Sequence, residues 1–308
     1  MIERVAILGA NSQIARDYIE SSLEKNKREL HLFSRNPMGL RDLVGSKYAA
    51  RFKCLEYDRF GLDSYNLIIN FVGGSDPVLI ANMDKDIFTI TDHYDDLAIS
   101  YLNKHSRCKY IFISSGAAYG DVFSSAPASE LTKANFDFNN LAPADYYGAA
   151  KYLAEQRHRK LAELNIIDIR IFSYISKRQN LDSKLFLPQV IAAIKNKAKF
   201  LTSDEEMWRD YIGPEDFFQL IELLLSINKL NISLDCYSKN SVEKLEILSN
   251  LREKFGLIYD VSNEYALKQN SKKYYFSKNK LAESYGYLPE HGSLDLIVGL
   301  TPNFVNWR

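Results

Sequence analysis

Short, nearly continuous apolar runs alternate with helical patterns along the first half of the chain. Strands are predicted at 4–8, 29–33, 52–56, 67–72, 110–114 and 166–172, and the main helices near 91–103, 146–164, 185–194, 216–227 and 241–255. Apolar strands separated by helices are typical of an α/β fold with a doubly wound parallel sheet. In such a sheet, ligands bind outside the carboxyl ends of the strands. We therefore expect the turns after the first, fourth and fifth strands to share one crevice.

Composition argues against several other classes of protein. Lys and Arg together number 39, as do Asp and Glu, so no net field favours nucleic acid or anionic lipid. The three cysteines are far apart and the five histidines form no close ligand pair, so we expect neither a disulfide framework nor a metal site. No charged leader precedes the first strand, and no run reaches the roughly 18 apolar residues of a membrane span. These features predict a soluble, cytoplasmic protein with no nucleic-acid or membrane partner.

The turn after the first strand has the spacing of a dinucleotide-binding turn. The three glycine positions of that turn hold Gly9, Ser12 and Ala15. An alanine still allows close packing, the Ser12 hydroxyl can donate to a phosphate oxygen, and the following helix N-terminus offers free N–H groups. A plain strand–turn–helix remains the alternative. The pattern predicts a pyrophosphate site formed by Gly9, Asn11, Ser12, Gln13 and Ile14.

The ends of the next strands indicate which dinucleotide binds. An NAD site usually has an acidic residue after the second strand, but here Ser34 and Arg35 follow. A guanidinium without a carboxylate suits a 2′-phosphate, which favours NADP(H), with NAD as the alternative. Asp58 after the third strand is expected at the adenine edge, although it could equally be a helix cap. The residues expected beside the cofactor after the fourth strand are Phe71, Val72 and Gly73.

A candidate catalytic group lies after the fifth strand. Tyr147 and Lys151 are four residues apart, so they share one face of the predicted helix, and Ser115 ends the strand upstream. A neighbouring ammonium and the positive ring of an oxidised nicotinamide favour the phenolate and lower the pKa of the phenol. Tyr147 could then exchange a proton with a substrate oxygen that Ser115 also hydrogen-bonds. The alternative is an ordinary surface pair.

This combination resembles the extended short-chain dehydrogenase/reductase family, which includes nucleotide-sugar epimerases, dehydratases and reductases. Ser115, Tyr147 and Lys151 match its catalytic positions, 208–212 its substrate-domain segment and 277–289 its C-terminal signature, so the resemblance covers nearly the whole chain. It implies a Rossmann-type NADP-binding domain, predicted over 1–172, and a smaller substrate-binding lobe, predicted over 173–308, some of whose strands could return to the main sheet. The resemblance also suggests a homodimer formed through the Tyr/Lys helix, with a monomer as the alternative.

The expected substrate is a nucleotide sugar, and the resemblance also suggests its contacts. Ser115, Ser173 and Arg209 are expected to touch it, with Arg209 on the diphosphate or, alternatively, paired with Asp210 or Glu215. Ser173 stands where the family has an Asn, so Lys177 or Arg178 could supply the lost phosphate contact or simply be solvated.

The family's variations narrow the reaction. Gly116 and Ala117 follow Ser115 where the 4,6-dehydratases carry Asp-Glu, so elimination of water is not expected. The resemblance therefore favours an NADPH-dependent reductase of a 4-keto-6-deoxy sugar nucleotide. The alternatives are a nucleotide-sugar 4-epimerase with tightly bound NAD, and a non-catalytic NADP-binding sensor or scaffold.

Overall fold

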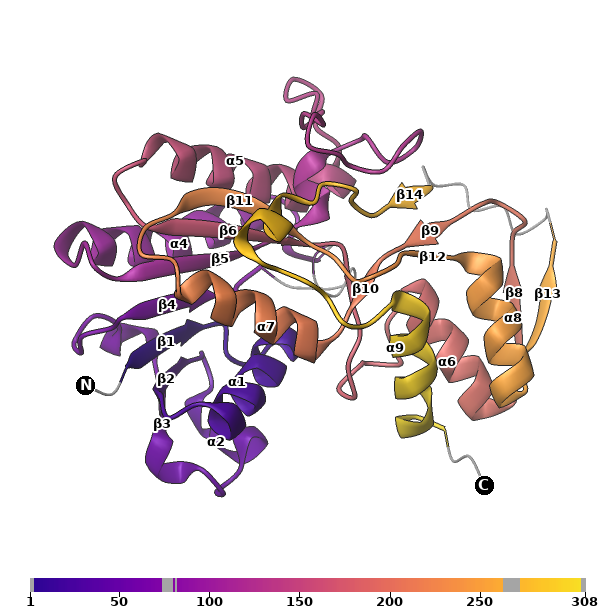
Figure 1. Cartoon of the computed structure of the whole chain (residues 1–308), viewed down its shortest axis with the longest axis horizontal. Helices are drawn as coiled ribbons and strands as arrows, with labels where there is room; N and C mark the ends of the chain where they lie inside the picture. The colour runs from indigo at the N-terminus through magenta and orange to yellow at the C-terminus, as the bar shows by residue number, and fades with distance from the viewer. Residues whose placement is uncertain (1–2, 74–79, 81, 263–271, 306–308) are drawn as a thin grey trace.

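The computed structural model describes residues 3–73, 80, 82–262 and 272–305. Within them, seven parallel strands form the central sheet: β1 (Arg4–Leu8), β2 (Glu29–Phe33), β3 (Phe52–Leu55), β4 (Leu67–Asn70), β5 (Lys109–Ser115), β6 (Ile166–Ile171) and β11 (Asn231–Cys236). Their order across the sheet is β11-β6-β5-β4-β1-β2-β3 (Figure 1). The predicted doubly wound α/β fold is confirmed, and β1 and β2 have the predicted bounds.

Helices cover both faces of this sheet, because successive residues of a strand point to opposite sides. Val5 and Ile7 share a core with α1 (Gln13–Lys25), α2 (Pro37–Val44) and α7 (Pro214–Leu225). Ala6 and Leu8 share a core with α4 (Asp86–Lys104) and α5 (Tyr146–Lys160) on the other face. The strands are therefore buried on both sides, as their continuous apolar runs indicate.

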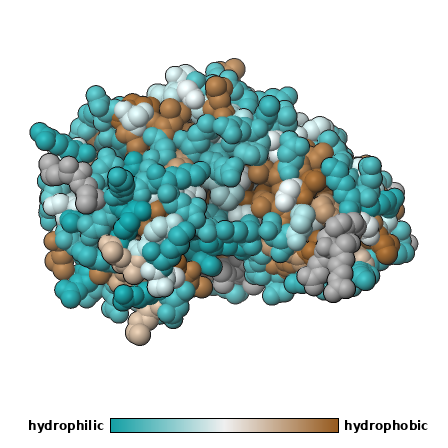
Figure 2. Space-filling view, turned by 60° about the horizontal axis from the view of Figure 1, so that its bottom comes forward, coloured by the Kyte–Doolittle hydropathy of each residue, from teal (hydrophilic) through white to brown (hydrophobic). Residues whose placement is uncertain are grey.

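A second lobe is built mostly from the later part of the chain. It contains α6 (Phe186–Asn196), α8 (Lys244–Phe255), α9 (Ser293–Leu300) and the short strands β7 (Ser173–Tyr174), β8 (Lys199–Thr202), β9 (Trp208–Arg209), β10 (Tyr211–Ile212), β12 (Val242–Glu243), β13 (Ile258–Val261) and β14 (Tyr274–Tyr275). Its helices enclose a separate apolar core. Figure 2 shows hydrophilic residues over much of one face, with apolar residues gathered at the right, where this lobe lies. Although β11 and α7 follow residue 173, they belong to the main sheet layer.

Short 3-10 turns complete the described structure: η1 (Ala49–Arg51), η2 (Tyr57–Arg59), η3 (Gly116–Tyr119), η4 (Pro143–Asp145), η6 (Leu281–Tyr285) and η7 (Thr301–Asn303). Among the helices described, none is both long and apolar enough to span a bilayer.

Polar contacts connect the second lobe to α1. Lys177 Nζ lies 2.9 Å from Glu20 Oε1, and Arg178 pairs with both Asp17 and Glu20. The Tyr174 hydroxyl donates to Asp17 Oδ2 at 3.0 Å. Lys177 and Arg178 therefore both have carboxylate partners on α1, and a phosphate contact by either stays a prediction.

Candidate active site

The last residue of β5 and the first turn of α5 meet at the carboxyl edge of the sheet. The Ser115 hydroxyl caps η3 by accepting a hydrogen bond from the Ala117 N–H at 3.1 Å. A Cβ at Gly148 would lie 2.3 Å from the Ala117 carbonyl oxygen, so only glycine allows α5 to approach η3 this closely. The approach brings Tyr147 beside Ser115, and the two side chains form a hydrogen bond. Two of the three predicted catalytic residues therefore touch.

Lys151 lies one turn further along α5 and is almost completely buried. Its ammonium donates to the Val72 carbonyl oxygen at 3.0 Å and to the Ile113 carbonyl oxygen at 2.9 Å. Its Nζ also lies 4.2 Å from the centre of the Phe112 ring. Burial lowers the pKa of Lys151 to about 8, against the opposing effect of nearby carboxylates. Since an ammonium has three donors, one remains for a ligand.

The pKa of Tyr147 differs from the expectation drawn from the sequence. Burial raises it well above its usual value, the neighbouring Tyr275 raises it further, and only the Ser115 hydrogen bond lowers it. Lys151 Nζ lies 5.9 Å from the centre of the Tyr147 ring. The protein's own groups therefore keep the phenol protonated, which suits a proton donor.

The predicted cofactor turn is linked to this group through Val72, which Gly9 approaches and whose carbonyl oxygen accepts from Lys151. Gly9 has φ +71°, and a Cβ there would lie 2.9 Å from the Val72 amide nitrogen. The Ser12 hydroxyl caps α1 by accepting from the Ala15 N–H, and the first turn of α1 contains no acidic residue. The helix N-terminus therefore keeps its positive end available, which fits the diphosphate of a dinucleotide.

The side chains of other predicted cofactor residues form contacts within the protein. Gln13 donates to the Ser176 hydroxyl at 3.1 Å, Ile14 packs against the core, and the Phe71 ring is buried in that core. Asn11 donates to the buried Ser34 hydroxyl at 2.8 Å. These contacts hold the turn in place, and of these side chains that of Asn11 stays exposed.

Charges at the rim of the turn remain exposed. Arg35 and Asp58 are both exposed, and within the described ranges neither forms an ion pair. A residue missed in the sequence also lies here, because the Tyr57 hydroxyl accepts the Gly9 N–H at 2.9 Å. Tyr57 comes two residues after the end of β3, so its position beside the turn could have been expected from the parallel sheet.

The second lobe contributes β14 to the site. Arg209 Nη1 donates to the carbonyl oxygens of Trp208 and Lys272, each at 2.7 Å, and makes no ion pair with a described residue. The alternative, an ion pair with Asp210 or Glu215, is therefore absent among these residues, and the predicted contact of Arg209 with a diphosphate stays a prediction. The Tyr275 hydroxyl, which sequence analysis missed, lies 3.3 Å from Ser115 Oγ.

Ser173, a predicted substrate contact, lies in β7, where it is half-buried and pairs with Tyr211 of β10.

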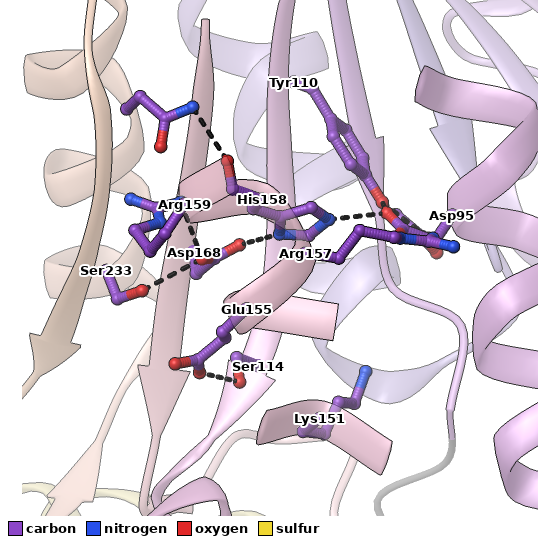
Figure 3. Close-up of polar contacts among 12 residues, drawn as sticks. Asp95, Tyr110, Ser114, Lys151, Glu155, Arg157, His158, Arg159, Asp168 and Ser233 are labelled. Carbon is purple, nitrogen blue, oxygen red and sulfur yellow. Dashed lines mark hydrogen bonds and ion pairs between the residues drawn. The ribbon is translucent and has the colours of Figure 1, made fainter. Parts of the chain in front are cut away.

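A buried network of ion pairs and hydrogen bonds connects α5 to the elements packed against it (Figure 3). His158 is held between Asp168 Oδ1 at 2.6 Å and Asp95 Oδ1 at 2.8 Å, and all three side chains are fully buried. Arg157 pairs with Asp95, and Arg159 pairs with Asp168. The network connects α4, α5 and β6, so it fixes the helix that carries Tyr147 and Lys151.

A parallel sheet with a serine at the end of β5 and a Tyr-x-x-x-Lys pair on the following helix defines an extended short-chain dehydrogenase/reductase. The chain belongs to the NAD dependent epimerase/dehydratase family, which it matches over residues 5–232. A search of curated protein sequences gave no match.

Solved structures share the fold over nearly the whole chain. UDP-glucose 4-epimerase from Thermotoga maritima is 15% identical with a TM-score of 0.78, and each chain is covered to 98%. UDP-glucuronic acid 4-epimerase from Bacillus cereus, in complex with NAD, is 16% identical with a TM-score of 0.75 and 98% coverage of each chain. dTDP-glucose 4,6-dehydratase from Bacillus anthracis is 12% identical with a TM-score of 0.76, covering 98% of this chain and 96% of the other.

Proposed function

We propose that this protein is an NADPH-dependent reductase of a keto group on a nucleotide-activated 4-keto-6-deoxy sugar. The observation that carries the proposal is the meeting of Ser115, Tyr147 and Lys151 beside the Gly9 turn. A structural pair on the helix surface would not need a buried lysine that donates to two carbonyl oxygens. The similar 4-epimerase structure from Thermotoga maritima contains UDP-glucose, which supports this substrate class.

Three side chains of the site have different roles in the reduction of the substrate carbonyl. Tyr147 holds the proton that reduction requires, because burial raises the pKa of its phenol and keeps it protonated. Ser115 hydrogen-bonds the same carbonyl oxygen and stabilises the negative charge that develops on it. Lys151 is fixed by two backbone carbonyl oxygens, which leaves one of its three donors for a bound ligand.

The cofactor is proposed to bind across the Gly9 turn, with its diphosphate at the N-terminus of α1. The nicotinamide supplies the hydride when bound. Arg35 is exposed just after β2, and neither Ser34 nor Asn36 beside it in the chain is acidic. We therefore favour NADPH over NADH, although the family is named for NAD.

Reduction is favoured over elimination because no acidic residue follows Ser115. Gly116 and Ala117 occupy those positions, and η3 brings no carboxylate next to the catalytic hydroxyl. The Ser115–Tyr147 pair would also serve a 4-epimerase, in which oxidation and reduction alternate at one carbon.

The test begins with the cofactor state of the purified protein. Spectroscopy for retained NAD is followed by fluorescence titration with NADPH and NADH, and then by turnover with a panel of 4-keto-6-deoxy sugar nucleotides. The proposal predicts exchangeable NADPH and its oxidation by at least one keto sugar. Tightly retained NAD with interconversion of 4-epimers would support the epimerase instead. Cofactor binding without turnover, unchanged by Tyr147→Phe, would support the scaffold.

A further inference from the structure

Tyr275 brings a third hydroxyl group into the catalytic centre. It lies on β14 of the second lobe, 160 residues along the chain from Ser115, and its hydroxyl is 3.3 Å from Ser115 Oγ. Burial raises the pKa of the Tyr275 phenol, although its hydrogen bonds with Ser115 and with the Ala117 N–H act against that effect. Neither the sequence motifs nor the family match, which ends at residue 232, includes Tyr275.

The hydrogen bonds around Ser115 determine where its proton points. A serine hydroxyl has one donor and two acceptor lone pairs. The Ala117 N–H fills one lone pair of Ser115 at 3.1 Å. If the Tyr275 hydroxyl donates to the other, both lone pairs are used and the Ser115 proton has to point elsewhere. The remaining direction is toward Tyr147, which is where a substrate oxygen must lie to receive a proton from the phenol.

Packing holds the Tyr275 ring firmly enough for this role. Its ring centre lies 4.9 Å from that of Phe123 and 5.4 Å from that of Phe172, both with edge-to-face character. Tyr275 also pairs with Arg209 in the β9–β14 ladder. An aromatic side chain packed on two sides and anchored by its strand loses little additional freedom when its hydroxyl forms a hydrogen bond.

We propose that Tyr275 is a positioning residue for the reaction: it donates to Ser115 and thereby directs the Ser115 proton to the substrate carbonyl. The inference rests on the proposed function, since it requires a carbonyl oxygen at Ser115 and Tyr147. It also gives the second lobe a part in catalysis beyond substrate binding, because β14 must be docked for Ser115 to be oriented.

The first experiment compares Tyr275→Phe with Tyr274→Phe in the full chain. Phenylalanine keeps the ring packing and removes only the hydroxyl. The hydroxyl of Tyr274 instead approaches Glu206 at 3.5 Å on an exposed surface, so its variant is a matched control. Loss of one hydrogen bond should lower kcat for the keto sugar about tenfold, with KM close to wild type and NADPH affinity unchanged. Tyr274→Phe should behave like the wild type.

A double-mutant cycle with Ser115→Ala separates positioning from a general structural effect. If Tyr275 acts through Ser115, Tyr275→Phe should lower kcat no further in the Ser115→Ala background. An equal loss in both backgrounds, or wild-type kcat for Tyr275→Phe alone, would overturn the inference while leaving the proposed function intact. A wild-type protein that reduces no keto sugar nucleotide would overturn the proposed function, and this inference with it.

Discussion

Replacing His158 by glutamine should change how the stability of this protein depends on pH. Burial lowers the pKa of His158, but hydrogen bonds and charge attraction from Asp168 and Asp95 outweigh it and raise the pKa from 6.5 to about 9. A group whose pKa is higher in the folded state stabilises that state when protonated. This contribution is complete below about pH 6.5 and is lost as the pH rises through about 9. The two pKa values correspond to about 3 kcal/mol of unfolding free energy.

The assay is urea unfolding of wild type and His158→Gln at several pH values from 6 to 10. Burial also lowers the pKa of Lys109 and of Lys151 to about 8, and these groups add stability as the pH rises. The difference between wild type and variant removes their contribution. We expect this difference to be largest at pH 6 and to shrink by about 3 kcal/mol by pH 10.

The control for this prediction is His93→Gln. His93 lies on the same helix as Asp95 but is exposed, so its replacement should leave the unfolding free energy close to wild type at every pH. The prediction is refuted if wild type and His158→Gln differ in unfolding free energy by the same amount at every pH from 6 to 10. That result would mean that His158 is neutral in the folded protein, with a proton shared differently between the two carboxylates.

Two further predictions concern the cofactor turn. Gly9→Ala should lower the unfolding free energy by about 2–4 kcal/mol, because it combines positive φ with a Cβ 2.9 Å from the Val72 nitrogen. Gly256 has a similar φ but open space around it, so Gly256→Ala should lower the unfolding free energy by only about 1–2 kcal/mol in urea unfolding. Equal losses for the two variants would contradict the claim that packing at Gly9 adds to the cost. Arg35→Ala should weaken NADPH binding about 10- to 100-fold in a fluorescence titration and leave NADH binding unchanged. Equal effects on both cofactors would remove the support for a 2′-phosphate site.

The sequence predicts the sheet well because its signal is local. Each apolar run from β1 to β6 lies close to its predicted position, and the helices α4 to α8 overlap their predicted ranges. The seventh strand, β11, was not identified. Its sequence alternates polar residues with apolar ones, and it lies at the edge of the sheet beside β6. Such a strand gives a weaker signal than a strand buried on both faces.

The site is harder to predict where residues far apart in sequence meet. The spacing of Tyr147 and Lys151 is visible because both lie on one helix. By contrast, Asp95, His158 and Asp168 come from three elements, and nothing in their local sequence indicates that they meet. Tyr275 reaches Ser115 only because β14 pairs with β9. The division into two domains at residue 173 stays a prediction, as does the homodimer.

The central claim is that Tyr147 gives its proton to the carbonyl of a nucleotide-activated sugar. Single-turnover oxidation of NADPH by a 4-keto-6-deoxy sugar nucleotide tests it most directly, with Tyr147→Phe compared with wild type and with Tyr146→Phe. Tyr146 packs against Phe88 and has no lysine one turn along the helix, which makes it the matched control. The account predicts that Tyr147→Phe slows the reaction about 10²- to 10⁴-fold while Tyr146→Phe does not. A Tyr147→Phe rate equal to that of the wild type would contradict it.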